Sequence, residues 1–286
     1  MEPTGPNAEQ IQFWNETAGP KWVDYQQRID AHVRVFGLLA INRAGIMPGE
    51  RALDVGCGCG DATLELARRV ETSGTVTGID ISSVMLDRAR TLAKTTGLTH
   101  LDFVNADAQT HAFVPSSFDL LYSRFGVMFF ADPQAAFANL FKALCPGGRF
   151  SFICWQELKK NPWAFVSLEA VAKHVEVPPS IPNAPGPFAF ANPDRVSHIL
   201  SKAGFRDVNI EGSIEEVAVG GTGNLDEAVD FLMQMGPAAA AIRKTGTPEK
   251  RSILVDALRH ALAPYQRSQG VQMPAAVWIV IGKRPL

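Results

Sequence analysis

The feature that most constrains this chain is a short apolar segment, 51–55, that runs into three glycines at alternate positions. Gly56, Gly58 and Gly60 are followed by Asp61, where a helical pattern begins. Glycine suits a backbone that must turn sharply and approach a ligand with no Cβ in the way. The free N–H groups of the helix that follows favour a carboxylate or phosphate nearby. The segment therefore predicts a strand, a ligand-binding turn and a helix in succession.

The same alternation of strand and helix continues to about residue 155. Short apolar runs alternate with stretches of helical periodicity, which predicts right-handed β-α-β units and a parallel sheet. We expect strands at 51–55, 75–80, 101–105, 118–122 and 149–155, with helices at 61–70, 83–95 and 133–144. The fold class predicted from the pattern is α/β.

The flanking segments are less regular. We expect helices at 21–46, 162–175, 193–203, 225–242 and 248–265, strands at 206–212 and 276–283, and a proline-rich stretch at 178–187. The helical residues between the last two strands predict a cap near the strand ends, where ligands bind in open sheets. The expected domains are a helical leader (1–48), a core (49–156), a segment after the fifth strand (157–205), and the last two strands (206–286) with a cap inserted at about 213–274.

Two carboxylates follow strands beside the glycine-rich turn. Asp80 ends the second strand, twenty residues after Gly60, where it can accept both hydroxyls of a ribose. Asp107 comes just past the third strand and can accept from the amino group of an adenine. Hydrogen bonds to a charged group contribute about 1.5–3 kcal/mol each. The alternative is that both side chains merely cap the helices or turns that follow them.

Position 61 separates two classes of adenosine cofactor. A dinucleotide fingerprint, Gly-x-Gly-x-x-Gly, requires a third glycine at this position, and the residue is Asp61. A negative charge there would repel a pyrophosphate, whereas a cofactor with an ammonium as well as a carboxylate tolerates it. Asp54, at the end of the first strand, also suits an ammonium. The pattern therefore favours S-adenosylmethionine over NAD.

Five motifs, in order over residues 50–155, resemble those of class I S-adenosylmethionine-dependent methyltransferases. They are Ala52–Gly60, Gly78–Ser82 with Met85-Leu86, Asp107-Ala108, Phe118–Ser123 and Leu144–Gly148. The resemblance is greatest to the small-molecule methyltransferases of the ubiquinone/menaquinone-biosynthesis type. It implies a Rossmann-like, seven-stranded, mostly parallel sheet with an antiparallel last strand, S-adenosylmethionine as cofactor, and methyl transfer to a small organic acceptor.

The resemblance also implies which residues contact the cofactor. The Gly56–Gly60 loop would hold the methionine end, Asp80 the ribose, Ile81 and Ala108 the adenine face, and Asp107 the adenine amino group. In the leader, Trp14 and Trp22 would close over the cofactor and screen the sulfonium, or would simply pack the first helix onto the sheet. The expected cofactor-binding residues are Trp22, Asp54, Gly56, Cys57, Gly58, Asp80, Ile81, Met85, Asp107, Ala108 and Ser123.

The acceptor side is less defined by the sequence. An apolar pocket would be lined by some of Trp155, Trp163, Phe188, Phe190, Met233 and Met235, each of which has a core role as its alternative. Tyr25, Trp155 and Phe188 are the candidate substrate-binding residues. His111, Tyr25 and Arg124 are open as proton acceptors, and none is assigned a catalytic role. The residues after the fourth strand, Ser123–Gly126, differ from the motifs of nucleic-acid base methyltransferases and lack an acidic pair for magnesium.

The charge and the cysteines of the chain argue against two classes of partner, nucleic acids and metal ions. The formal net charge is −2 and Lys and Arg form no block of five or more, which argues against a nucleic-acid partner. The four cysteines show no Cys-x-x-Cys spacing, so we expect Cys57 and Cys59 to fill a tight loop and no metal to be bound.

The sequence also predicts a location. No apolar run approaches the roughly 18 residues that span a bilayer, and the first residues lack signal-peptide character, so we expect a cytoplasmic monomer or homodimer with no membrane span. The alternatives left open are a methyltransferase acting on protein or nucleic acid, an NAD-linked dehydrogenase and a non-catalytic cofactor-binding regulatory module.

Overall fold

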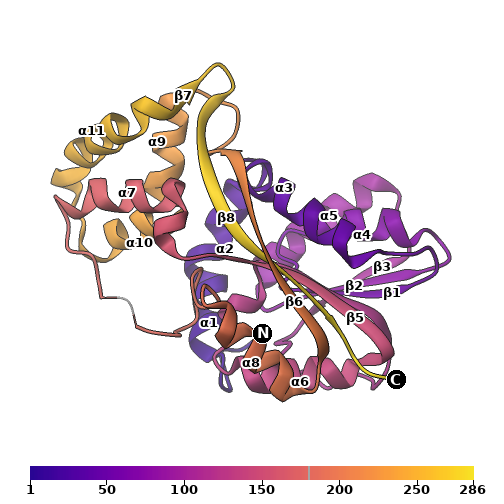
Figure 1. Ribbon diagram of the computed structural model, residues 1–286. Helices are drawn as coiled ribbons and strands as arrows, with labels where there is room; N and C mark the ends of the chain where they lie inside the picture. Colours follow the sequence, from indigo (N-terminus) through magenta and orange to yellow (C-terminus); the bar gives the residue numbers. More distant parts are fainter. Residues whose placement is uncertain (180) are drawn as a thin grey trace.

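Within residues 1–179 and 181–286, which the computed structural model describes, seven strands lie side by side in one twisted sheet (Figure 1). They are β1 (Arg51–Val55), β2 (Thr75–Asp80), β3 (Leu101–Asn105), β4 (Phe118–Arg124), β5 (Leu144–Trp155), β6 (Arg206–Ala218) and β8 (Gly270–Lys283). The order across the sheet is β3-β2-β1-β4-β5-β8-β6, and the short β7 (Gln266–Arg267) pairs with β8. Neighbours among β1–β5 are parallel, whereas β8 is antiparallel to β5 and β6. The expected α/β fold is confirmed.

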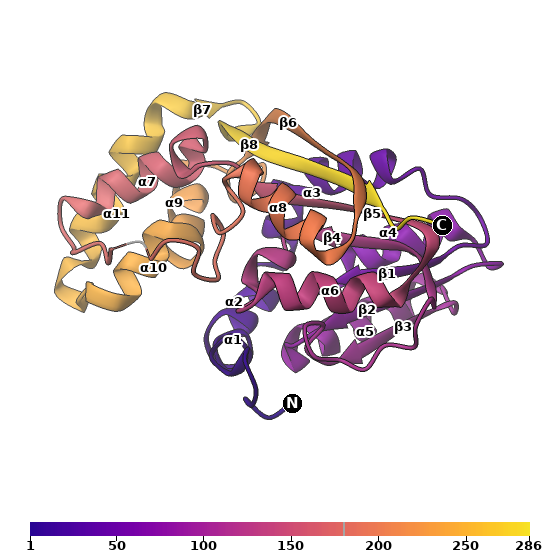
Figure 2. The ribbon, with the colours of Figure 1, turned by 60° about the horizontal axis from the view of Figure 1, so that its bottom comes forward.

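Helices cover both faces of the sheet (Figures 1 and 2). One face carries α3 (Gln26–Ala44), α4 (Asp61–Val70) and α5 (Ser83–Thr96), and the other carries α6 (Pro133–Ala143) and α8 (Pro193–Ala203). Local sequence sets their ends. Ser82 caps α5 by accepting the N–H of Met85, and Gly204, with φ +105°, ends α8 in the left-handed conformation.

The leader is broken into short helices. α1 (Ala8–Gln12), the π-helical turn η1 (Phe13–Thr17) and α2 (Ala18–Asp24) precede α3. The single helix expected over 21–46 was wrong, because the chain leaves helical geometry at Tyr25 (φ −99°, ψ 10°). The break allows α2 to contact α5 while α3 packs against β4 and β5. The leader thereby reaches from the sheet face to the strand ends.

A cap stands beyond the carboxyl ends of the strands. It comprises α7 (Pro162–Ala172), α9 (Leu225–Gln234), α10 (Gly236–Thr245) and α11 (Arg251–Leu262). The helix expected over 225–242 divides into α9 and α10 because Pro237 cannot continue a helix and begins a new one instead. Although α7 precedes β6 in the chain, it packs against α10 and α11.

Single 3₁₀ turns lie at η2 (Val127–Phe129), η3 (Leu158–Lys160), η4 (Pro248–Lys250) and η5 (Ala263–Tyr265). Ser180, in the proline-rich stretch, lies outside the described residues.

The last two strands are longer than the sequence pattern indicated. β6 and β8 pair from Arg206↔Lys283 to Ala218↔Gln272, whereas β5 pairs only with the second half of β8, Val277–Lys283. The first half of β8 therefore forms a two-stranded ribbon with β6 that leaves the sheet and leads into the cap (Figure 1). The cap residues between these strands are 219–269, against the expected 213–274.

A partly buried arginine ties β4 to two helices. Arg124 donates from Nη1 to Asp61 Oδ2 at 2.7 Å and from Nη2 to Asp30 Oδ1 at 2.8 Å. The three side chains are 12–24% exposed. Burial opposes the charged guanidinium, yet Asp30 and Asp61 raise the pKa of Arg124 above its ordinary value. The bridge fixes the start of α4, and with it the glycine-rich loop, against α3.

Replacing this arginine should destabilise the fold. We expect Arg124→Met to cost about 3 kcal/mol of unfolding free energy, because two partly buried carboxylates lose their counter-charge. Urea unfolding followed by circular dichroism measures the difference. The matched control is Arg69→Met, which removes a more exposed pair with Glu65 on one helix and should cost about 0.3–0.5 kcal/mol. Equal losses in the two variants would show that this bridge stabilises the fold no more than an exposed ion pair does.

Candidate functional site

The loop after β1 has a backbone that only glycine fits. Gly56 has φ +66° and Gly58 has φ +55°. A Cβ on Gly56 would lie 2.7 Å from Cα of Gly126, so the turns after β1 and β4 are in contact. The N–H of Gly56 donates to the carbonyl of Ile79 at 2.9 Å, which fastens the loop to β2. The loop lies between β1 and β4, where the strand order reverses and open α/β sheets bind ligands.

Asp80, at the end of β2, holds this loop in shape through its carboxylate. Its Oδ2 accepts the N–H of Gly58 at 2.8 Å, and its Oδ1 accepts the N–H of Ser82 at 2.8 Å. Burial raises the pKa of Asp80 although the two N–H groups favour its charged form. Each carboxylate oxygen can accept two hydrogen bonds, so Asp80 caps the turn and keeps acceptor capacity for a ligand. Its expected contact with a ribose stays a prediction.

Asp54 is a buried carboxylate with one unsatisfied oxygen. It is 1% exposed, and its Oδ2 accepts the hydroxyl of Thr63 at 2.7 Å. Its Oδ1 is buried without a hydrogen-bond partner. Burial raises the pKa of Asp54 to about 7. Because a buried acceptor without a donor is costly, this oxygen marks a place where a cationic donor from a ligand would be stabilised.

Asp107 is held by the leader. The side-chain amide nitrogen of Asn7 lies 2.9 Å from both carboxylate oxygens, and Gln109 donates its N–H to Oδ1 at 2.9 Å. Asn7 is itself buried and accepts the N–H of Ala131 at 2.7 Å. Thr110 Oγ1 also donates to Oδ2 at 3.3 Å. The expected contact of Asp107 with an adenine amino group stays a prediction. The sequence carried no signal for Asn7, whose partners lie 100 or more residues away.

Ser123 and Met85 surround the glycine loop from two sides. Ser123 Oγ donates to the carbonyl of Val55 at 2.7 Å and accepts the N–H of Gly126 at 3.2 Å, which joins the ends of β1 and β4. The Met85 methyl group would lie 2.8 Å from a Cβ on Gly58. Both residues support the loop, and their expected contact with a cofactor stays a prediction.

Three further candidates lie beside Asp80 and Asp107. Cys57 is buried beside Gly78, and burial raises the pKa of its thiol, so it packs as a small protonated side chain. Ile81 is half-buried, and its carbonyl accepts the side-chain amide of Asn15 at 3.0 Å. Ala108 is buried directly after Asp107.

Aromatic residues of the leader lie against the loop after β2. Trp14 packs edge-to-face on Trp22 at 5.5 Å and on Phe129 at 5.1 Å between ring centroids. The carbonyl of Trp14 accepts the hydroxyl of Ser82 at 2.8 Å. The structure therefore brings Trp22 and Trp14 together with the segment that carries Asp80, by contacts that packing alone also explains.

On the acceptor side, aromatic rings gather where the cap meets the core. Trp155 stacks on Phe125 with centroids 4.2 Å apart and lies 5.1 Å from Trp163 of α7. Tyr25 lies at the seam between leader and cap, where its hydroxyl donates to Asp230 at 3.0 Å. Phe188 is half-buried in the loop before α8.

Phe190 does not line this junction. It packs on Phe137 and Phe152 in the core between the sheet and α6, which agrees with the core role that the sequence favoured for it.

The negative charge of Asp61 is neutralised by two arginines of the protein. Asp61 pairs with Arg124 at 2.7 Å and lies 3.8 Å from Arg34. Its negative charge is balanced inside the protein, so repulsion of a pyrophosphate is much weaker than the sequence suggested. The choice of cofactor depends instead on Asp54, whose free oxygen suits an ammonium.

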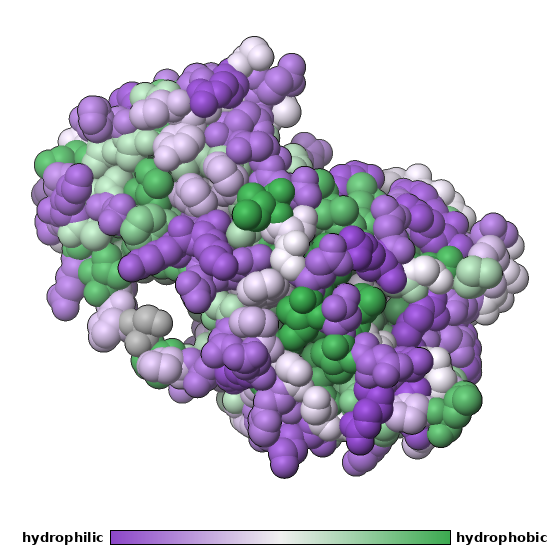
Figure 3. Space-filling view, viewed as in Figure 1, coloured by the Kyte–Doolittle hydropathy of each residue, from purple (hydrophilic) through white to green (hydrophobic). Residues whose placement is uncertain are grey.

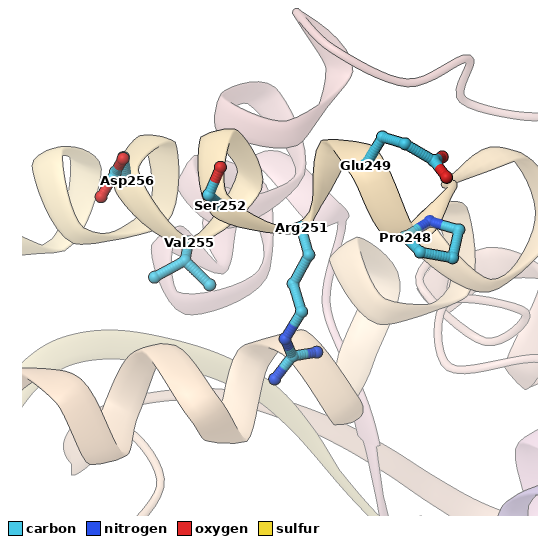
Figure 4. A pocket seen from close by; sticks show the side chains of 6 residues that line it. All are labelled: Pro248, Glu249, Arg251, Ser252, Val255 and Asp256. Carbon is cyan, nitrogen blue, oxygen red and sulfur yellow. The ribbon is translucent and has the colours of Figure 1, made fainter.

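Two surface hollows lie away from the glycine loop. One runs along η4 and α11 of the cap, where Figure 4 shows Arg251 on the opposite side of the helix from Ser252 and Asp256. The other lies between β2 and the loop at 111–118 and is lined in part by His111, which packs on Phe113. The face drawn in Figure 3 intersperses hydrophilic and hydrophobic residues.

The described residues contain neither a cluster of metal-ligating side chains nor a helix that could span a membrane. In residues 1–179 and 181–286, no three His, Cys, Asp or Glu side chains cluster as a metal site. No helix in those ranges has the length and apolar character to cross a membrane.

Comparison with known proteins identifies the core. Residues 52–148 match the family model described as "Methyltransferase domain". An uncharacterized protein of Mycobacterium bovis is 36% identical over 132 residues, which cover 46% of this chain and 47% of that protein. Aklanonic acid methyltransferase of a Streptomyces species is 39% identical over 104 residues, covering 36% of this chain and 47% of that protein. The matched segments thus span about half the length of these relatives.

A solved structure extends the similarity to most of the fold. Phosphoethanolamine N-methyltransferase 2 of Haemonchus contortus, in complex with phosphomonomethylethanolamine and S-adenosylhomocysteine, superposes with a TM-score of 0.54. The match covers 87% of this chain and 52% of that one at 19% identity. At this identity the match shows the fold.

The buried carboxylate of Asp54 predicts a pH dependence. Its folded pKa, about 7, lies above that of an unfolded chain, so the folded state binds its proton more tightly between about pH 4 and 7. Stability should therefore be lost as pH rises through this window, by up to about 4 kcal/mol.

Asp54→Asn provides the comparison, because an amide oxygen keeps the Thr63 hydrogen bond without the charge. Urea unfolding at pH 5 and pH 8 should show wild type losing several kcal/mol relative to the variant. A pH-independent difference would contradict the assignment.

Proposed function

We propose that the protein is an S-adenosylmethionine-dependent methyltransferase that acts on a small organic molecule. The observation that carries this proposal is the buried, unpartnered Oδ1 of Asp54 beside a loop in which Gly56 leaves no room for a side chain. S-adenosylmethionine supplies an ammonium, a carboxylate and a methyl group already activated on a sulfonium. The residues present fit that set of groups.

Each part of the site has a role under this proposal. Asp54 would accept from the ammonium, and the glycine loop would leave space for the methionine chain. Asp80 would accept from the ribose hydroxyls, and Asp107, shared with Asn7, would accept from the adenine amino group. Trp14 and Trp22 would exclude water, since methyl transfer depends on positioning and desolvation more than on acid–base chemistry.

A small-molecule acceptor is supported by three observations. The named relative acts on aklanonic acid, as its name states. The formal net charge of −2 is unsuited to a polyanion. Aromatic rings gather at the junction of cap and core, where Trp155 and Phe125 are stacked. The five sequence motifs favour the ubiquinone/menaquinone-biosynthesis type within this class.

The ribose role of Asp80 can be tested by cofactor binding. Asp80→Asn should weaken binding of S-adenosylhomocysteine roughly ten- to hundredfold, because charge-assisted hydrogen bonds worth about 1.5–3 kcal/mol are lost. Asn is preferable to Ala, which would leave the N–H groups of Gly58 and Ser82 without acceptors. Isothermal titration calorimetry measures the affinity. The control is Asp119→Asn, at the opposite end of the sheet, and an unchanged affinity in Asp80→Asn would remove Asp80 from the site.

Methyl transfer itself can be measured without knowing the acceptor. The purified protein is incubated with methyl-labelled S-adenosylmethionine and an extract of its host, and the products are separated by size. Label should appear in the low-mass organic fraction, where the acceptor can be identified. Label in protein or nucleic acid would overturn the proposed acceptor class. Cofactor binding without transfer to any fraction would favour a non-catalytic binding module.

A further inference from the structure

His32, in α3, is a buried histidine with one unsatisfied ring nitrogen. It is 3% exposed, and its Nδ1 lies 3.4 Å from the carbonyl oxygen of Ala218. A carbonyl oxygen only accepts, so we assign the ring proton to Nδ1. Nε2 then carries the lone pair, and it is buried without a hydrogen-bond partner. Burial lowers the pKa of His32 to about 4, which keeps the ring neutral near pH 7.

The surroundings of His32 are aromatic and come from separate elements. Trp163 of α7 lies edge-on at 4.9 Å, Phe231 of α9 at 6.1 Å and Trp155 of β5 at 6.3 Å between ring centroids. The indole N–H of Trp163 is already donated to Asn161 Oδ1 at 3.2 Å. Nε2 of His32 is therefore a free acceptor enclosed by apolar rings at the junction of cap and core.

This junction is continuous with the glycine loop. Trp155 stacks on Phe125, and Phe125 is followed by Gly126, which touches Gly56. A molecule lying beside His32 and Trp155 would thus be separated from the loop only by the turn after β4. The arrangement places an apolar wall with a single hydrogen-bond acceptor next to the proposed cofactor site.

We propose that His32 selects the methyl acceptor by receiving a hydrogen bond at Nε2 from a hydroxyl or amine carried on an aromatic or apolar body. The proposal rests on the proposed methyltransferase function and assigns a specificity-determining residue on its acceptor side. A matching donor satisfies the buried nitrogen, whereas a molecule without one leaves it unpaired. A site built in this way discriminates against the analogue that lacks the polar group.

Phe231, which packs on His32, lies at the seam between leader and cap, 6.2 Å from Tyr25 between ring centroids. There Tyr25 and Arg28 contact Asp230 of α9 at 3.0 and 3.2 Å. The Arg28 and Asp230 side chains are 27% and 47% exposed, and ion pairs of this exposure contribute little to stability. A molecule that reaches His32 along this seam would have to displace Phe231 of α9 and the contacts that Tyr25 and Arg28 make there.

The test uses two naphthalene ethers or alcohols of similar size, of which only one carries a hydrogen-bond donor. Equilibrium dialysis against protein saturated with S-adenosylhomocysteine measures the affinities of 2-naphthol and 2-methoxynaphthalene, each corrected for its partition between water and octanol. Wild type should bind 2-naphthol roughly three- to tenfold more tightly. His32→Phe should abolish this preference, and His32→Gln, whose Oε1 can accept, should retain part of it.

The matched control is His100→Phe. His100 also has a buried ring nitrogen without a partner, but it precedes β3 at the opposite edge of the sheet. This variant should keep the preference for 2-naphthol. An unchanged preference in His32→Phe with normal affinity for S-adenosylhomocysteine would overturn the proposal, as would a wild type that binds neither probe. A preference that depends on His32 in a protein that transfers no methyl group would overturn the proposed function alone.

Discussion

The contact between the turns after β1 and β4 governs the arrangement of this protein. A Cβ on Gly126 would lie 2.6 Å from the carbonyl oxygen of Val55, and one on Gly56 would meet Gly126, so neither turn has room for a side chain. This approach exists because the strand order reverses between β1 and β4. It places the carboxylate of Asp54 on one side of the contact and the ring of Phe125 on the other. The glycine loop and the aromatic junction therefore both adjoin this contact.

The central β-α-β units were predictable because each is specified locally, by apolar periodicity and by capping residues such as Ser82. What the sequence pattern missed depends on pairing between distant segments. The outer halves of β6 and β8 have little local signal, since each is stabilised mainly by the other across more than fifty residues. The break at Tyr25 likewise follows from α2 and α3 packing on different elements. The division between α9 and α10, in contrast, has a local signal, because Pro237 favours the start of a new helix.

In the candidate site, too, local features could be predicted and contacts between distant residues could not. The glycines and Asp80 could be predicted because they form a local motif, in which glycine φ angles and one carboxylate shape a single turn. The contacts of Asn7 and His32 could not be predicted, because they are made with residues that are remote in the chain, Asp107 for Asn7 and Ala218 for His32. The charge of Asp61 was predicted to repel a pyrophosphate. That prediction left out Arg124, which comes from β4 and neutralises this charge. The net charge around a residue cannot be predicted from neighbouring residues in the sequence when its counter-charge lies on another strand.

The ribbon of β6 and β8 constrains how such a protein can change in evolution. Side chains on a strand alternate between faces, so inserting one residue in each strand would turn the attachment points of the cap to the opposite side. Inserting two in each preserves the faces and moves the cap outward by about 7 Å. The distance between α9 and the strand ends is therefore adjustable only in discrete increments, with paired insertions in both strands. Gradual enlargement of the junction must come instead from side-chain substitutions, such as a smaller residue at Phe231 or Trp163.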